Sequence, residues 1–231
     1  MTNTLITGAN KGLGLETARR LADAGHTVFL GARDDRRGRE AARLVGAHPL
    51  LIDVTSEESV QAAAKEVRER TGRLDVLVNN AGISGATGPA GEITGHDMLH
   101  VYDTNVFGVV RVMHAFLPLL AASDAPVVVN VSSGLGSLAW TTDPDRFESQ
   151  VHLVAYNSAK SAVNMITSQY AKAYPGMRIN AVDPGYTATD LNGHQGSQTV
   201  AEGAEIIVRM ARVDAEGPTG GYFNAEGPVP W

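Results

Sequence analysis

The feature that most constrains this chain is its regular alternation of short apolar runs with longer segments of helical periodicity. The apolar runs predict strands at 5–6, 27–32, 50–52, 76–78, 127–131, 179–182 and 222–223. Apolar residues at helical spacing predict helices over 15–22, 36–45, 60–67, 109–120, 155–174 and 204–211. Strands joined through helices form a parallel sheet, and continuous apolar runs indicate that both sheet faces are covered. The predicted fold class is therefore α/β, a doubly wound parallel sheet with helices on both faces.

Length and composition indicate a single domain over residues 1–231. The chain is 43% hydrophobic and 19% charged, which suits a packed core. A capping box, with Thr55 three residues before Glu58, is expected to start one helix. Two stretches, 134–153 and 188–198, are expected to be irregular, and each follows a predicted strand. Ligands of open α/β sheets bind at strand ends, so both stretches are candidates for a site.

Charge and residue types exclude several classes of function. The net charge of −6 argues against a nucleic-acid or anionic-membrane partner. The chain has no cysteine and its histidines form no ligand cluster, so no metal site is expected. Neither a signal peptide nor an apolar run of the ~20 residues that span a bilayer is seen, so a cytoplasmic location is expected.

A glycine-rich turn lies between the first predicted strand and helix. Gly8, Gly12 and Gly14 have the spacing G-x-x-x-G-x-G within Thr7–Gly14. Glycines let backbone amides approach a pyrophosphate, and a helix N-terminus favours its charge. The plain alternative is a tight strand–helix turn without a ligand.

Three side chains could carry proton chemistry. Tyr156 and Lys160 are four residues apart on a predicted helix, so the phenol and the ammonium share one face. A nearby cation lowers a tyrosine pKa, which would make a proton donor usable at neutral pH. Ser133 follows the strand at 127–131, where a hydroxyl points into the ligand crevice. The alternatives are an ordinary surface pair and ordinary turn chemistry.

Together these motifs resemble the short-chain dehydrogenase/reductase family over essentially the whole chain. The resemblance rests on the three glycines, Asn79–Gly82, Asn105, Ser133, the Tyr156/Lys160 pair, and Pro184–Gly185 with Thr189. It implies a single Rossmann-type domain and an oxidoreductase that transfers hydride. The family often pairs through the helices that hold Asn105 and Tyr156, which implies a homo-oligomer, although an inserted segment could obstruct that contact.

The resemblance also implies a role for each site residue. Tyr156 would protonate a carbonyl oxygen, and Lys160 would hold the ribose and lower the tyrosine pKa. Ser133 would polarise the substrate oxygen, and Asn105 would position a water that links Lys160 to solvent. The cofactor-binding residues implied by motifs and resemblance are Gly8, Asn10, Lys11, Gly12, Leu13, Gly14, Arg33, Asp53, Val54, Asn80, Ala81, Gly82, Val131, Tyr156, Lys160, Pro184, Gly185, Thr187 and Thr189. Asp53 and Val54 would flank the adenine.

The turn after the second strand favours NADP over NAD. NAD-binding proteins usually place an acid there for the ribose diol, whereas this strand ends at Ala32 and Arg33. Lys11 and Arg33 could converge on a 2′-phosphate instead. The alternatives are solvated surface charges, and a shifted turn that presents Asp34 to the diol.

The segment 134–153 separates Ser133 from Tyr156 by more than most of the family has. With the Asn-Lys-Gly of the glycine turn, it is similar to the carbonyl reductase branch, although it is shorter than in animal carbonyl reductases. Trp140 is expected to line a pocket for an apolar ketone, aldehyde or quinone, and Phe147 either to line it or to pack the loop onto the domain. An NAD-dependent alcohol dehydrogenase and a non-catalytic NADP-sensing protein remain as alternatives.

Overall fold

The computed structural model describes residues 1–231 and contains one parallel sheet of seven strands. The strands are β1 (Asn3–Ile6), β2 (Thr27–Ala32), β3 (His48–Leu51), β4 (Val76–Asn79), β5 (Val127–Val131), β6 (Arg178–Val182) and β7 (Tyr222–Phe223). Their order across the sheet is β3-β2-β1-β4-β5-β6-β7. Every predicted strand is confirmed, and the ends differ by at most two residues because propensity locates boundaries poorly.

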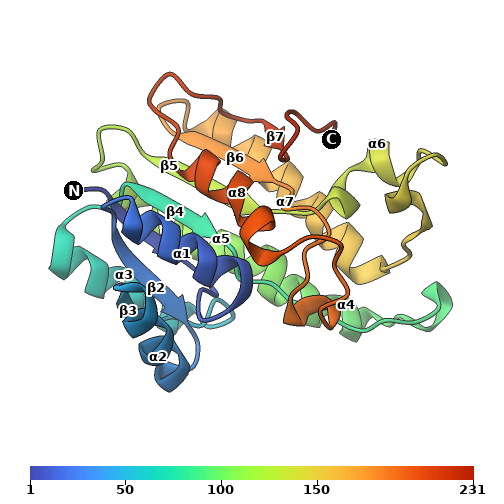
Figure 1. Ribbon diagram of the computed structural model, residues 1–231, viewed down its shortest axis with the longest axis horizontal. Helices are drawn as coiled ribbons and strands as arrows, with labels where there is room; N and C mark the ends of the chain where they lie inside the picture. The colour runs from blue at the N-terminus through green and yellow to red at the C-terminus, as the bar shows by residue number, and fades with distance from the viewer.

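Helices cover both faces of this sheet (Figure 1). They are α1 (Gly12–Asp23), α2 (Asp35–Val45), α3 (Glu57–Thr71), α4 (Gly95–Tyr102), α5 (Gly108–Leu120), α6 (Leu138–Thr141), α7 (Val154–Ala173) and α8 (Val200–Ala211). Helices α3, α5 and α7 pack in one buried cluster, whereas α1, α2 and α8 pack in the other. The predicted doubly wound fold is confirmed.

Neighbouring residues of one strand belong to opposite clusters. Leu5 packs with α3 and α5, whereas Ile6 packs with α1 and α8. In the same way, Val128 contacts one cluster, and Val127 and Val129 contact the other. Side chains alternate across a strand, so burial on both faces favours apolar residues at successive positions, with Thr4 and Asn130 as buried polar exceptions. This is the physical origin of the continuous apolar runs.

The start of α3 differs from the sequence prediction, and the helices α4 and α6 were not predicted. Ser56 caps α3 by accepting a hydrogen bond from the Ser59 amide, so the expected Thr55–Glu58 capping box is wrong. The Thr55 hydroxyl instead donates to the Asp53 carboxylate at 2.7 Å, a local hydrogen bond that competes with helix capping. Helix α4 was not predicted, because its eight residues show no clear apolar stripe.

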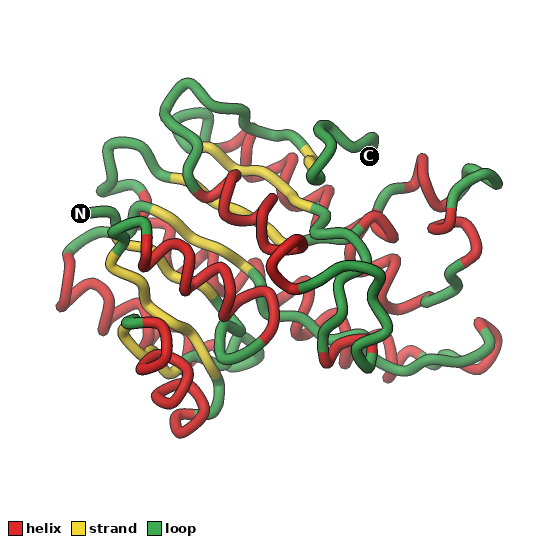
Figure 2. The backbone as a smooth tube through the Cα atoms, viewed as in Figure 1, coloured by secondary structure: helices red, strands yellow, loops and turns green.

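The strand order reverses between β1 and β4, and this places the ligand crevice. From β1 the chain winds outward to β3, and from β4 it winds the other way to β7. The loops at the carboxyl ends of β1 and β4 therefore separate and leave a crevice between them. The segment 134–153 follows β5 at the same edge and forms short helical turns around α6 (Figures 1 and 2).

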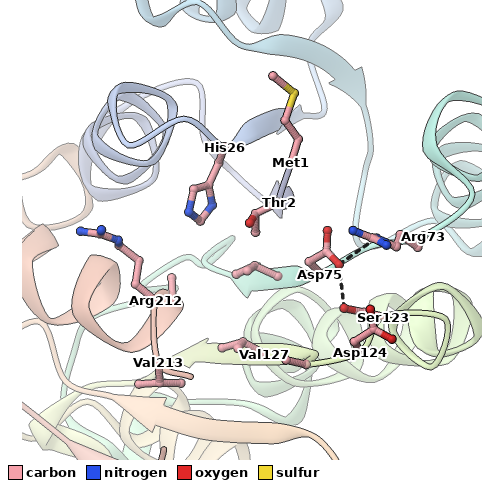
Figure 3. Close-up of a pocket in the computed structure, with 13 residues that line it drawn as sticks. Met1, Thr2, His26, Arg73, Asp75, Ser123, Asp124, Val127, Arg212 and Val213 are labelled. Carbon is pink, nitrogen blue, oxygen red and sulfur yellow. Dashed lines mark hydrogen bonds and ion pairs between the residues drawn. The ribbon is translucent and has the colours of Figure 1, made fainter. Parts of the chain in front are cut away.

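A cavity of about 390 Å³ lies at the opposite edge of the sheet, beside the amino ends of the strands. Figure 3 shows Asp75 there, held by Arg73 and Ser123, with His26 and Arg212 across from it. None of the motif residues lines this cavity. Among the helices of the chain, none is both long and apolar enough to cross a membrane.

Candidate active site

The glycine turn is tied to the loop after β4 by four hydrogen bonds. The Thr7 hydroxyl accepts from the amides of Asn80 and Ala81 at 3.0 and 3.1 Å. The Asn80 side-chain amide donates back to the carbonyls of Thr7 and Gly8 at 2.9 and 3.1 Å. A Cβ on Gly14 would lie 2.5 Å from the Asn80 Nδ2, so only glycine fits there. The structure thus brings together two motifs that lie about seventy residues apart in the sequence.

The end of α1 that faces this turn suits a pyrophosphate. Gly8 and Gly12 have φ of +62° and +56°, a left-handed region that favours glycine. Lys11 occupies the N-cap position in extended conformation, and its side chain does not cap the helix. No acid stands in the first turn, so the free amides and the positive helix end remain for an anion. These residues fit a dinucleotide.

The charged side chains expected near the adenosine half of the dinucleotide differ in their contacts. Lys11 Nζ lies 2.7 Å from the Asp190 carboxylate, and both side chains are exposed. Arg33 is exposed and makes no hydrogen bond or ion pair. Asp34 caps α2 by accepting from the Arg37 amide at 2.9 Å. The acid that could have bound a ribose diol therefore has a structural role already.

The segment expected to flank the adenine is held firmly. Asp53 Oδ1 accepts from the amide of Thr55 at 3.0 Å as well as from its hydroxyl. Val54 is buried, and its carbonyl accepts a hydrogen bond from Arg111 at 3.2 Å. The side chain of Val54 also packs against Gly108, the first residue of α5.

Ser133, Tyr156 and Lys160 meet at the carboxyl edge of β5. Tyr156 and Lys160 project from the first turns of α7, and both are buried. The Tyr156 side chain lies near the Ser133 hydroxyl, two residues after the end of β5. Lys160 Nζ lies 5.5 Å from the centre of the Tyr156 ring and donates to the Val131 carbonyl at 2.8 Å. The predicted side-by-side placement of phenol and ammonium is confirmed.

The predicted low pKa of Tyr156 is wrong for the chain by itself. Burial raises the pKa of Tyr156 to about 12, although the hydrogen bond with Ser133 acts the other way. Burial also lowers the pKa of Lys160 to about 8. Desolvation is the largest cause, and the Lys160 ammonium donates its hydrogen bond to the Val131 carbonyl. At neutral pH Tyr156 is therefore a neutral phenol, the form that can donate a proton.

Asn105 lies in a π-helical turn, Asp103–Phe107, that joins α4 to α5. Its amide accepts from the Ile83 amide at 2.9 Å and donates to the Ile83 carbonyl at 2.8 Å. Gly82 lies between Asn105 and Lys160, since a Cβ there would be 3.5 Å from Asn105 Oδ1 and 3.8 Å from Lys160 Nζ. The side chain of Asn105 thus holds the loop after β4 beside the lysine.

The segment after β6 reaches back to the glycine turn. Gly185 has φ of +73°, and the Thr187 hydroxyl accepts from Gln198 at 2.9 Å. Thr189 packs near Gly12, where a Cβ would lie 3.7 Å from its methyl group. This segment, with Pro184 at its start, therefore lies close to the glycine turn.

The segment 134–153 packs Trp140 inward, differently from the prediction, and leaves Phe147 exposed. Trp140 packs against the buried cluster of Ala181, Tyr222 and Val229, and the Arg146 guanidinium stacks on it at 3.6 Å. Phe147 is 59% exposed, and its ring lies 6.0 Å from that of Tyr186. Trp140 is thus mainly a packing residue, whereas Phe147 is largely exposed beside Tyr186.

Comparison with known proteins decides the family. A family model described as short chain dehydrogenase matches residues 2–200. The chain belongs to the short-chain dehydrogenase family. Members of the family are oxidoreductases with nicotinamide cofactors.

Two plant enzymes and one animal structure are among the most similar proteins. The (−)-isopiperitenone reductase of Mentha piperita is 33% identical, over 95% of both chains. The (+)-neomenthol dehydrogenase of Capsicum annuum is 31% identical, over 95% of this chain and 94% of the relative. The NADPH-bound carbonyl reductase from chicken fatty liver superposes with a TM-score of 0.88 at 27% identity, over 100% of this chain and 99% of the other.

Sequence reasoning missed some residues beside this site. Asp183 is a buried acid directly before Pro184, and Tyr222 donates a hydrogen bond to the Ser133 carbonyl. An acid at the end of an otherwise apolar strand was the available signal for Asp183. Tyr222 gave no signal, because its partner lies 89 residues away. The homo-oligomer implied by the family stays a prediction.

Lys160→Met should stabilise the fold at pH 7. Lowering the lysine pKa from 10.5 to about 8 corresponds to a cost of roughly 3 kcal/mol for burying the ammonium. Because methionine loses the hydrogen bond to Val131, we expect a net gain of about 1–2 kcal/mol in urea unfolding. The cost of burying the Lys160 ammonium is full below about pH 8 and disappears above pH 10.5, where the lysine is neutral in the folded and the unfolded chain. The stability gained by Lys160→Met should therefore shrink between these two pH values.

Lys65→Met on the exposed face of α3 is the matched control and should change stability by less than about 0.5 kcal/mol. A Lys160→Met chain that is less stable than the unmodified chain at pH 7 would contradict the assigned cost of the buried charge.

Proposed function

We propose that this chain reduces a carbonyl compound, a ketone, aldehyde or quinone, to an alcohol with NADPH, and that Tyr156 donates the proton. The observation that carries the proposal is the buried contact of Tyr156 with Ser133, beside Lys160, at the carboxyl edge of the sheet. The glycine turn that fits a dinucleotide lies at the same edge, after β1.

The chemistry follows from the protonation states. NADPH, when bound, supplies the hydride that adds to the carbonyl carbon. As negative charge develops on the carbonyl oxygen, the neutral Tyr156 phenol gives it a proton. The Ser133 hydroxyl donates a hydrogen bond to the same oxygen and polarises the carbonyl. A phenol with a raised pKa is a weak acid in the free chain, so cationic charge near it has to favour the phenolate during the reaction.

Lys160 is the cation available for that task. Its Nζ is held by one hydrogen bond, to the Val131 carbonyl, so two of its three protons remain for ribose hydroxyls. The ammonium is 5.5 Å from the phenol ring, where it also favours the phenolate that forms on proton transfer. The Asn105 side chain binds the backbone of Ile83 and so fixes the loop after β4, which passes beside Lys160 at Gly82.

Alcohol oxidation by the same residues is the second candidate. It is favoured by the relative from Capsicum annuum, whose name is that of a dehydrogenase. The steps above then run in reverse, with Tyr156 accepting the proton. A purely NADP-sensing protein is disfavoured, because Asn105, Ser133, Tyr156 and Lys160 are all in place.

Tyr156→Phe should reduce turnover by at least ~10²–10⁴-fold, because it removes the proposed proton donor and keeps the ring. The loss should appear in NADPH consumption with a panel of aldehydes, ketones and quinones. NADPH affinity, measured by fluorescence titration, should change little. Tyr170→Phe on the same helix is the matched control and should keep full turnover. Near-normal turnover of Tyr156→Phe would refute the assignment of the proton donor.

Arg33→Ala should weaken NADPH binding by about tenfold or more and leave NADH binding nearly unchanged. Arg33 is exposed and has no partner of its own, whereas Asp34 is engaged as a helix cap. A charge-assisted contact to the 2′-phosphate contributes about 1.5–3 kcal/mol. Arg36→Ala, on the neighbouring turn, controls for a general loss of positive charge. Equal affinity of the unmodified chain for NADH and NADPH would overturn the choice of cofactor.

Phe147→Ala should raise the KM for bulky apolar carbonyls several-fold and leave NADPH affinity and thermal stability unchanged. Phe147 and Tyr186 are 59% and 44% exposed, and they face each other from the two loops beside the site. An apolar substrate would bury both rings. Trp140→Ala provides the contrast, since it should lower the melting temperature. Unchanged KM values for Phe147→Ala across the substrate panel would show that this pair lies outside the substrate pocket.

A further inference from the structure

Two stacked aromatic rings lie beyond β6 from Ser133 and have no role in the reaction described so far. Tyr222 on β7 is only 2% exposed. Its ring stacks on that of Trp231, with 5.5 Å between the ring centres and 20° between the planes. A buried phenol needs a partner for its hydroxyl group, so the partner of Tyr222 indicates what the residue does.

The Tyr222 hydroxyl reaches past β6 to the loop that carries the serine. Strand β7 pairs with β6 alone, in the register that places Tyr222 beside Ala181, and β5 lies on the other side of β6. The hydroxyl donates to the Ser133 carbonyl at 2.5 Å. The Ser132 amide still bonds to the Val182 carbonyl of β6 at 2.7 Å, whereas the backbone of Ser133 makes no hydrogen bond to β6. Tyr222 therefore holds the first residue that the neighbouring strand leaves free.

The turn that Tyr222 holds determines where the Ser133 hydroxyl lies. The Ser133 carbonyl also accepts from the Gly136 amide at 2.7 Å, which closes a tight turn. Gly136 lies directly against α7, since a Cβ there would be 2.8 Å from the backbone carbonyl carbon of Lys160. Ser133 Oγ accepts from the Leu135 amide at 3.3 Å, so its own proton remains free for a substrate oxygen. The position of this hydroxyl beside α7 thus depends on a turn that is anchored from β7.

Residues 228–231, called the strap below, connect β7 to the continuation of the serine loop. The Ser137 hydroxyl donates to the Pro230 carbonyl at 2.7 Å, and Ser137 is fully buried. The Ala139 amide, in α6, donates to the Trp231 carbonyl at 3.1 Å. Figure 1 shows the chain near its C label beside β7, on the side that faces α6. The strap therefore binds α6 through its backbone and covers the phenol ring of β7 through the Trp231 side chain.

We propose that Tyr222 is a positioning residue for the carbonyl reduction, which places the Ser133 hydroxyl through the Ser133 carbonyl, and that Trp231 supports it. The inference rests on the proposed function for its kinetic part only. A hydrogen bond weakens steeply when its distance or angle changes, so a small shift of the serine lowers its effect on the reacting oxygen. That hydrogen bond strengthens as charge develops on the oxygen, so the loss falls on kcat and not on KM.

The test is a double-mutant cycle between Tyr222→Phe and Ser133→Ala. Phenylalanine keeps the buried ring and its stack and removes only the hydroxyl. We expect kcat to fall about three- to tenfold, the range that one neutral hydrogen bond contributes, with KM and NADPH affinity within about twofold. In the Ser133→Ala chain the same change should alter kcat by less than about twofold, because the hydroxyl that Tyr222 places is already gone. Tyr174→Phe is the matched control, since the Tyr174 hydroxyl makes no hydrogen bond within the chain, and it should leave kcat unchanged in both backgrounds.

The part played by the strap is tested at Trp231. Trp231→Ala removes the ring that covers Tyr222 and keeps the backbone hydrogen bond to Ala139. It should lower kcat in the same direction as Tyr222→Phe, again with little change in KM. Trp231→Phe keeps an aromatic ring on Tyr222 and should recover most of the lost turnover.

A readout that needs no turnover separates this inference from the proposed function. The amides of Gly136, Ser137 and Ala139 are all hydrogen-bonded, so hydrogen–deuterium exchange of a peptide over 134–141 reports how firmly the serine loop is held. Exchange of this peptide should be faster in Tyr222→Phe and in Trp231→Ala than in the unmodified chain. It should be unchanged in Tyr174→Phe, and a peptide over β1 should exchange alike in all four chains.

Equal fold losses of kcat from Tyr222→Phe with and without Ser133 would overturn the inference, because Tyr222 would then act independently of the serine. Unchanged kcat and unchanged exchange in Tyr222→Phe would overturn it as well, even if the melting temperature falls. A chain that reduces no carbonyl compound, yet shows the faster exchange over 134–141, would refute the proposed function and retain the hold of Tyr222 on the serine loop.

Discussion

Burial of the sheet on both faces is the constraint on which the rest of the molecule depends. Strands β1, β4 and β5 have no exposed residue, so their middles offer no place for chemistry. Polar groups with a chemical role must therefore stand at the strand ends, where the chain leaves the core. The glycine turn after β1, the Asn79–Gly82 loop after β4 and Ser133 after β5 are all at the carboxyl ends. The hydrogen bonds between Thr7 and Asn80 hold two of these ends together across the point where strand order reverses.

The sequence was sufficient for the fold because burial on both faces produces continuous apolar runs in the central strands. The motifs of the family it resembles pointed to Ser133, Tyr156 and Lys160, and the spacing of four residues predicted that the phenol and the ammonium share one helix face. The sequence was not sufficient for their protonation. The direction of the Tyr156 pKa depends on desolvation, and desolvation depends on which segments fold over the phenol.

Segment 134–153 is a second case in which the sequence alone could not predict the outcome. Its sequence identifies large apolar residues but not their partners. Trp140 packs inward because Arg146 stacks on it and a buried cluster from β6 and β7 meets it. Phe147 stays exposed because its neighbour is another exposed ring, Tyr186. Contacts between distant segments decided both outcomes, and no local pattern reports such contacts.

The exposed ion pair between Lys11 and Asp190 has a consequence for how a cofactor could come and go. An exposed pair of this kind contributes only about 0–1 kcal/mol. A 2′-phosphate that takes Lys11 would replace one anionic partner by another, so the lysine exchanges ligands at almost no net cost. The same exchange would release Asp190 and the turn that carries it from the glycine loop. Hydrogen bonds of the Asn192 side chain to Thr187 and Thr189 would still close that turn, so the exchange would change one surface contact and leave the local backbone in place.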